Sequence, residues 1–339
     1  MTASPLKLLI IGAGMIGAFF DTPESPQVLT HAHAFSALPG FELVGFVDPN
    51  GVKLESAVER WGGTGNSSVN CKGFQSIETA MAEVTPDVVC VASPDETHGD
   101  ILRVLAQYPL KLVFAEKPLT TDLAEAEEIV RLYEERNIPL AVNYSRRYVP
   151  EFRVLQSRVR EGELGRFVSG AGCYGKGLTH NGTHLLDLLH WFLGPFQQVQ
   201  VLDSVTDFTP EDPSYSAVLW FDNQRPFHLS AVDSRLFTLF EMDLLFEKGR
   251  VRMNEAGFEL EISEVQPDTR FTGYQTLHLT DKVNTGLDQA LSHAAVSLEA
   301  HLLHQGTLAC SGQNALTALA MAEEIRNHQK ASTLVTPIA

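Results

Sequence analysis

A glycine-rich turn near the start of this 339-residue chain has the spacing of a nucleotide-binding site. Gly12, Gly14 and Gly17 directly follow the apolar run Leu6–Ile11 and form the pattern GxGxxG. Such a turn lets a pyrophosphate approach the backbone at the start of a helix. The predicted cofactor contacts in this turn are Gly12, Gly14, Met15, Ile16 and Gly17. A glycine-rich turn without a ligand is the alternative.

A carboxylate closes the second predicted strand, Phe41–Val47. Asp48 stands where a carboxylate takes the ribose hydroxyls of a dinucleotide, although it could be only a turn residue. It lies farther past Gly17 than is usual, and the stretch Asp21–Thr30 reads as an insertion that absorbs the excess. Because a 2′-phosphate beside Asp48 would be repelled, the sequence predicts NAD rather than NADP.

A lysine follows another apolar run, Leu110–Ala115, in the tripeptide Glu116-Lys117-Pro118. The proline ends the strand and fixes the turn, so Lys117 should emerge at the strand's carboxyl end. Ligands of an open α/β sheet bind at that edge. A partly desolvated lysine can donate to a substrate hydroxyl or exchange a proton with it. A solvated surface lysine is the alternative.

Four ionisable side chains lie between His180 and His190. A helix that starts near Gly182 would hold His184 in its first turn, where the positive helix end favours a neutral imidazole able to accept a proton. Asp187, three residues later, could orient that ring. A packed structural histidine is the alternative reading of His184.

The same cluster also has metal-ligand spacing. His180 and His184 stand at i and i+4, and Asp187 could be a third ligand. However, Gly182 is expected to break the helix between the two histidines, and no HExxH glutamate is present. We therefore predict no metal site.

The spacing of apolar residues along the chain alternates between strand-like and helix-like patterns. This alternation predicts the elements that position the candidate residues. Up to Arg147, short apolar strands alternate with amphipathic helices, which is typical of an α/β, doubly wound parallel sheet. After that point strands dominate with hairpin-like spacing, and a short end strand is expected at Thr333–Pro337. We predict a Rossmann domain over residues 1–147 and a C-terminal α+β domain over residues 148–339, with a large, mainly antiparallel sheet.

Composition limits the partners. The formal charge of −17 argues against nucleic acid and against an anionic membrane surface. The four cysteines are scattered without a CxxC pair, which favours free thiols in a reducing compartment. The N-terminal segment lacks a secretory pattern, and no apolar run reaches transmembrane length. These features predict a cytoplasmic protein.

Taken together, these residues resemble the Gfo/Idh/MocA family of NAD(P)-dependent sugar and inositol oxidoreductases over nearly the whole chain. The motifs that carry the resemblance are GxGxxG, Asp48, Ser93-Pro94 with His98, Glu116-Lys117-Pro118, Asn143 to Pro150 and the His184 helix. The resemblance implies an open C-terminal sheet that faces a partner, in a homodimer or homotetramer. It further implies a cofactor site that includes Ser93, Pro94, His98, Glu116, Lys117, Asn143 and Arg147.

The resemblance also implies roles in catalysis. Lys117 would hold the substrate hydroxyl, and His184 would be the general acid/base. The family often has aspartate where this chain has His180, so the proton relay would use His180, Asn181 or Asp187.

The expected function is hydride transfer between nicotinamide and a secondary alcohol of a sugar, a cyclitol or a sugar derivative, including nucleotide sugars and phospho-sugars. Two alternatives stay open: a redox-neutral, NAD-dependent enzyme that cleaves glycosides, and a non-catalytic NAD-dependent sensor or regulator.

Overall fold

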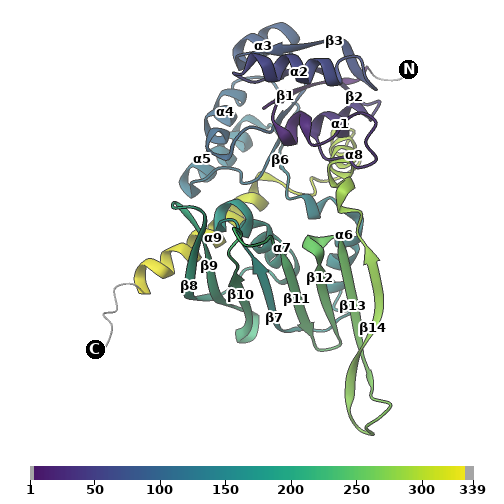
Figure 1. Ribbon diagram of the computed structural model, residues 1–339, viewed down its shortest axis with the longest axis vertical. Helices are drawn as coiled ribbons and strands as arrows, with labels where there is room; N and C mark the ends of the chain where they lie inside the picture. The colour runs from purple at the N-terminus through teal and green to yellow at the C-terminus, as the bar shows by residue number, and fades with distance from the viewer. Residues whose placement is uncertain (1–3, 333–339) are drawn as a thin grey trace. The chain divides into compact units, whose positions relative to one another are not determined.

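The computed structural model describes residues 4–332, which form two compact units (Figure 1). The first unit contains the chain up to Val149 together with Asp288–Leu316, and the second contains Pro150–Leu287 and the residues from Thr317 onward. Residues 288–316 return to the first unit because α8 (Ala290–Leu302) packs its apolar side chains against α1 (His31–Ser36). The predicted domain division after residue 147 stays a prediction.

The first unit holds a six-stranded sheet in the order β3-β2-β1-β4-β5-β6, in which every neighbouring pair is parallel. The core strands are buried along nearly their whole length, because helices cover both faces of such a sheet. The doubly wound parallel sheet is confirmed. Its strands are β1 (Leu6–Ile11), β2 (Phe41–Val47), β3 (Ser67–Phe74), β4 (Val88–Val91), β5 (Leu112–Ala115) and β6 (Leu140–Val142).

Capping side chains start the helices of this unit. Asn50 accepts hydrogen bonds from two backbone N–H groups of the first turn of α2, and Ser76 and Asp122 each accept one at the starts of α3 and α5. These caps fix where α2, α3 and α5 begin, whereas α4 starts without a side-chain cap. The crossover helices are α2 (Gly51–Trp61), α3 (Ile77–Val84), α4 (His98–Leu105) and α5 (Leu123–Arg136).

The second unit is built on an eight-stranded sheet in the order β14-β13-β12-β11-β7-β10-β9-β8. Only β7 and β10 pair in parallel, so the prediction of a mainly antiparallel sheet is confirmed. The hairpin of β13 and β14 extends beyond the neighbouring strands (Figure 1). The strands are β7 (Phe167–Tyr174), β8 (Gln198–Thr209), β9 (Asp212–Phe221), β10 (Arg225–Ala231), β11 (Glu241–Phe246), β12 (Gly249–Asn254), β13 (Glu259–Pro267) and β14 (Gln275–Asn284).

Three helices accompany this sheet: α6 (Pro150–Arg160), α7 (Thr183–Leu193) and α9 (Gly312–Ser332), the last of which begins in the first unit. The expected end strand Thr333–Pro337 lies outside the described residues. Within residues 4–332, no helix is both long enough and apolar enough to cross a membrane.

Candidate functional site

The three glycines of the turn after β1 differ in the space around them. Gly12 has a φ of +101°, and a Cβ there would lie 2.4 Å from the carbonyl oxygen of Ala92. A Cβ on Gly17 would lie 2.0 Å from the carbonyl oxygen of Gly12. A Cβ on Gly14, in contrast, would meet nothing within 4 Å. Open space against bare backbone is what a pyrophosphate requires, so this turn fits a dinucleotide.

Met15 and Ile16 begin a short π-helical turn, η1 (Met15–Phe19), that follows this open space. The Met15 side chain is 53% exposed. The first α-helix, α1, begins only at His31, so the segment that reads as an insertion separates the glycine turn from it.

Asp48 connects the end of β2 to the glycine turn. One carboxylate oxygen of the buried Asp48 accepts a hydrogen bond from the Ala13 backbone N–H at 3.1 Å, and the other accepts one from Asn50 N–H at 2.9 Å. A cavity of about 390 Å³ is lined by Gly12, Asp48, Ser93 and Pro94, among others. The structure thus brings four of the predicted cofactor contacts into one cavity.

His98 lies beneath this region and is fully buried. Its Nδ1 is 2.8 Å from the carbonyl oxygen of Pro118, and its Nε2 is 3.0 Å from that of Ser93. A neutral imidazole has one N–H and donates to one of these carbonyls at a time. His98 therefore ties the turn after β4 to the turn that carries Lys117, and it is not among the residues that line the cavity.

Glu116 is held by side chains from two other elements. His31 Nε2, from α1, lies 2.8 Å from Glu116 Oε1, and Asn143 Nδ2, after β6, donates to the same oxygen at 2.7 Å. His31 is fully buried and packs edge-to-face on Phe114 of β5. The backbone after β5 is thereby fixed on both sides, one residue before the half-buried Lys117.

The charge of Glu116 is stabilised in its buried site. Burial alone would raise its pKa, but the hydrogen bond and charge of His31, the hydrogen bond from Asn143 and the charge of Lys117 outweigh burial. The net effect lowers the pKa of Glu116 below its ordinary value of 4.5. The ionised Glu116 carboxylate and the positive charge of the neighbouring Lys117 attract each other.

Asp21 organises the inserted segment. Its carboxylate accepts hydrogen bonds from Leu29 N–H at 2.6 Å and from the Thr30 hydroxyl at 2.5 Å, and it lies 3.0 Å from His33 Nδ1. Thr30 in turn caps α1 by accepting from the backbone N–H of His33. The segment therefore ends in a fixed cap that sets where His31 enters the core.

In the second unit, His180 and His184 lie on one continuous helical segment. A π-helical turn, η4 (Leu178–Gly182), runs directly into α7, and Gly182 has helical dihedral angles of φ −59° and ψ −32°. The expectation that Gly182 breaks the helix between the two histidines is therefore wrong. A glycine is needed because a Cβ on Gly182 would lie 2.7 Å from the ring of Tyr174.

The environments of the two histidines differ. The His180 ring stacks on Phe208 with ring centroids 4.6 Å apart, and the His184 ring meets Phe240 edge-on at 6.2 Å. Asp187, one turn after His184, is buried. His184 is preceded by the π-helical turn and is therefore not at a free helix start, which weakens the helix-dipole argument for its neutral state.

Two charged side chains, Asp212 and Arg326, hold the π-helical turn in place. Asp212 accepts hydrogen bonds from the backbone N–H groups of Thr179 at 2.8 Å and His180 at 2.9 Å. Arg326 of α9 donates to the Thr179 hydroxyl at 2.6 Å and lies 3.6 Å from the Asp212 carboxylate. The two residues thus fix the backbone that leads into the His184 helix.

Arg147, which was predicted beside the cofactor, is buried in a short 3₁₀ turn after β6. It belongs to the first unit, as do all the predicted cofactor contacts, whereas His180, His184 and Asp187 belong to the second.

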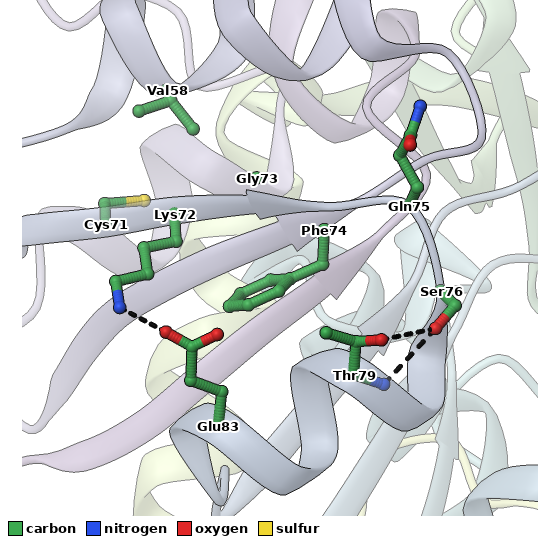
Figure 2. A pocket seen from close by; sticks show the side chains of 9 residues that line it. All are labelled: Val58, Cys71, Lys72, Gly73, Phe74, Gln75, Ser76, Thr79 and Glu83. Atoms are coloured by element: carbon green, nitrogen blue, oxygen red, sulfur yellow. Dashed lines mark hydrogen bonds and ion pairs between the residues drawn. The ribbon is translucent and has the colours of Figure 1, made fainter.

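A second, larger hollow of the first unit lies at the sheet edge formed by β3 (Figure 2). It measures about 700 Å³ and is lined by residues from Val58 to Glu83. Its polar side chains already bind one another: Lys72 pairs with Glu83, and Ser76 with Thr79 (Figure 2). This hollow therefore lacks the convergent polar groups of the cavity at Asp48.

Comparison with known proteins bears on the first unit. Residues 6–144 match the Gfo/Idh/MocA oxidoreductase family, described by its NAD-binding Rossmann fold. The resemblance is confirmed. UDP-N-acetylglucosamine 3-dehydrogenase of Acidithiobacillus ferrooxidans is 26% identical over 147 residues, which are 43% of this chain and 39% of that protein. Inositol 2-dehydrogenase of Corynebacterium glutamicum is 26% identical over 201 residues, 56% of this chain and 54% of that protein.

The matched regions therefore span about half the length of these relatives or less. A solved structure extends the likeness of fold to the whole chain. The WlbA dehydrogenase from Bordetella pertussis, in complex with NADH and UDP-GlcNAcA, is similar with a TM-score of 0.79 and 18% identity, over 98% of this chain and 97% of that one. At this identity the likeness shows the fold alone.

Three residues of the site network were not predicted: His31, Asp212 and Arg326. His31 lies 85 positions from Glu116, and Arg326 lies 147 positions from Thr179. No local spacing connects such pairs. The sequence did offer one sign that His31 has a buried polar partner. His31 and His33 lie at the start of a short, mainly apolar helix, and histidines are unusual in a segment that is buried throughout.

Proposed function

We propose that this protein is an NAD-dependent oxidoreductase that acts on a secondary alcohol of a sugar, a cyclitol or a sugar derivative. The observation that carries the proposal is the anchoring of Lys117. Buried Glu116, held by His31 and Asn143, fixes this lysine at the carboxyl edge of the sheet whose first turn fits a dinucleotide. The two relatives are named as dehydrogenases of a UDP-sugar and of inositol, which supports this substrate class.

The chain would hold the dinucleotide through the glycine turn, Asp48 and the turn at Ser93-Pro94. When bound, the nicotinamide exchanges a hydride with the carbinol carbon of the substrate. Lys117 would stabilise negative charge on the substrate oxygen, and His184 would take its proton, with His180 and Asp187 as candidate relay groups. The Asp48 carboxylate, anchored by two backbone N–H groups, would repel a 2′-phosphate, which supports NAD over NADP.

A single-turnover absorbance assay tests the proposal. Protein in excess over NAD is mixed with free sugars, cyclitols, sugar phosphates and nucleotide sugars, and the formation of reduced nicotinamide is followed. We expect rapid formation with one class. Silence across the panel, with NAD binding confirmed by titration, would contradict a simple dehydrogenase and favour the redox-neutral or the regulatory alternative.

The variant Lys117→Ala should lower turnover with the identified substrate by about 10²–10⁴-fold, the usual contribution of a group that assists proton transfer or stabilises charge. NAD affinity should stay within about twofold. Lys111→Ala is the matched control, because Lys111 flanks the opposite end of β5 and is exposed. Equal loss of turnover and NAD binding in Lys117→Ala would show that the lysine supports structure rather than catalysis.

A further inference from the structure

A cation, an aromatic ring and an imidazole lie together on the second unit, next to the His184 helix. The Lys176 ammonium is 5.8 Å from the ring centroid of Phe208, and the same ring stacks on His180 with centroids 4.6 Å apart and planes inclined by 23°. Phe208 is 43% exposed, and Lys176 is also exposed. An accessible aromatic surface is thus flanked by two nitrogen-bearing side chains.

The backbone that presents Lys176 is held in a conformation that a lysine rarely adopts. Lys176 has a φ of +69° and stands between two glycines that admit no side chain. A Cβ on Gly175 would lie 2.4 Å from the carbonyl oxygen of Val232, and one on Gly177 would lie 2.2 Å from Asp212 Oδ2. A left-handed conformation at a non-glycine residue is unfavourable and persists only when its surroundings enforce it.

One buried carboxylate enforces this turn. Asp207 accepts hydrogen bonds from Lys176 N–H at 2.5 Å, from Ser234 N–H at 3.2 Å and from the Ser214 hydroxyl at 2.8 Å. Because Asp207 binds backbone and hydroxyl groups, its charge is directed into the turn. Asp212 likewise serves the backbone of Thr179 and His180 and pairs with Arg326. The two carboxylates that hold this turn, Asp207 and Asp212, are therefore engaged with donors other than the Lys176 ammonium.

We propose that Lys176, together with the Phe208–His180 pair, recognises a negatively charged substituent on the sugar substrate. The inference rests on the proposed function, and it narrows the substrate to a sugar that carries a phosphate, a diphosphate or a carboxylate. A lysine ammonium offers three donors to such a group, and the exposed ring of Phe208 packs against the apolar face of a sugar or a base. In a chain with a net charge of −17, this fixed cation provides a local attraction for an anion.

Binding measurements on the full chain with saturating NAD test the subsite without requiring turnover. Isothermal titration calorimetry compares three matched pairs: glucose 6-phosphate against glucose, glucuronate against glucose, and UDP-N-acetylglucosamine against N-acetylglucosamine. We expect one anionic ligand to bind the wild type at least about tenfold more tightly than its neutral counterpart. The pair that shows this difference distinguishes a phosphate, a carboxylate and a nucleoside diphosphate as the recognised group.

Variants locate the effect. Lys176→Met should weaken the preferred anionic ligand by about 10- to 100-fold and leave its neutral counterpart unchanged, whereas Lys176→Arg should retain most of the affinity. Lys248→Met is the control, since Lys248 is an exposed lysine before β12 in the same unit. The proposal is overturned if no anionic ligand binds more tightly than its neutral partner, or if Lys176→Met binds the anionic ligand as the wild type does.

Absorbance in the same samples separates the two hypotheses. Charge-selective binding that depends on Lys176, without any NADH, supports the subsite and contradicts the dehydrogenase. NADH formed equally well from neutral sugars, and unaffected by Lys176→Met, supports the dehydrogenase and overturns the subsite.

Discussion

The three glycines of the first turn show that one motif can combine residues with different functions. Gly12 and Gly17 are required by the close packing of backbone on backbone, since a side chain on either would meet a carbonyl oxygen. Gly14 has open space around its Cα and is not required by the fold itself. Packing explains Gly12 and Gly17, and the proposed contact with the cofactor is what accounts for Gly14.

This distinction gives a paired prediction. Gly14→Ala should leave the thermal midpoint within about 2 °C of the wild type, yet weaken NAD binding at least tenfold, because the methyl group takes the space proposed for the pyrophosphate. Gly12→Ala should destabilise the fold by about 2 kcal/mol or more, because the new Cβ is both strained and in collision. Differential scanning calorimetry and NAD titration measure the two effects. Normal NAD affinity in Gly14→Ala would remove this turn from the cofactor site.

Glu116 provides a prediction on pH. Its pKa in the folded protein lies below the ordinary value of 4.5, so the folded state binds fewer protons than the unfolded state in this range. The stability that Glu116 contributes is therefore fully present above pH 4.5 and is lost as the pH falls through the lowered pKa. Glu116→Gln should cost about 1–3 kcal/mol at pH 7, and this difference should shrink below pH 4.5.

Urea unfolding of both proteins at pH 7, 5 and 4 tests this linkage. Glu127→Gln serves as the control, because Glu127 is an exposed carboxylate on the surface of α5. A difference between wild type and Glu116→Gln that stays constant with pH would show that the carboxylate contributes by its shape and not by its charge.

At the scale of elements, the sequence was sufficient where burial is uniform and insufficient at one edge of each sheet. β1 and β5 are predicted by mainly apolar runs because both of their faces are largely buried. β3 was not predicted, because this edge strand reads SSVNCKGF and alternates weakly. β14, the edge of the second sheet, is mostly exposed and was missed for the same reason.

The π-helical turn before His184 could not be predicted from the sequence for a related reason. A glycine in a helical pattern usually indicates a break, but Gly182 is selected by the proximity of the Tyr174 ring and not by backbone freedom. That ring comes from β7, and its position depends on the sheet as a whole. Local sequence therefore identified His180, His184 and Asp187 as candidates and predicted His184 and Asp187 on one helix, whereas the continuation of that helical segment back to His180 required the tertiary structure.

Arg326 tests whether this turn matters for catalysis. Arg326→Ala removes the donor to the Thr179 hydroxyl and the partner of Asp212, which should cost about 1–3 kcal/mol of stability. If His184 is the acid/base, kcat should fall more than KM rises, because the turn that leads into its helix loses support. Urea unfolding and steady-state kinetics provide both readouts. Arg166→Ala is the control, because it removes an exposed arginine paired with Glu247. It should change the free energy of unfolding by no more than about 0.5 kcal/mol and should leave kcat and KM unchanged.

At the scale of the whole molecule, the chain is not a simple tandem of two segments. Residues 288–316 return to the first unit, where a Cβ on Gly40 would collide with the Glu299 side chain of α8. The resemblance of motifs indicated two architectures in sequence order and could not show this return. It depends on packing between helices more than 250 residues apart, which no local pattern records.

At this scale we also expect the chain to assemble through its second sheet into a homodimer or a homotetramer. The β13–β14 hairpin extends beyond its neighbours (Figure 1) and exposes Phe271 by 61%, Tyr274 by 69% and Leu279 by 56%. Contiguous exposed apolar side chains on a monomer mark an interaction surface, because leaving them in water forfeits about 25 cal/mol for each Å². Sedimentation velocity at micromolar concentration should therefore show a species larger than the 37.3 kDa monomer.

Leu279→Glu should shift this species toward the monomer, because it would bury a charge without a partner. Val154→Glu is the control, since Val154 is a similarly exposed apolar residue at 61% but lies on α6. A wild type that sediments as a monomer, or an equal response of the two variants, would contradict assembly through the hairpin. If the prediction holds, the exposed apolar side chains of the hairpin are explained, because a second copy of the chain covers them.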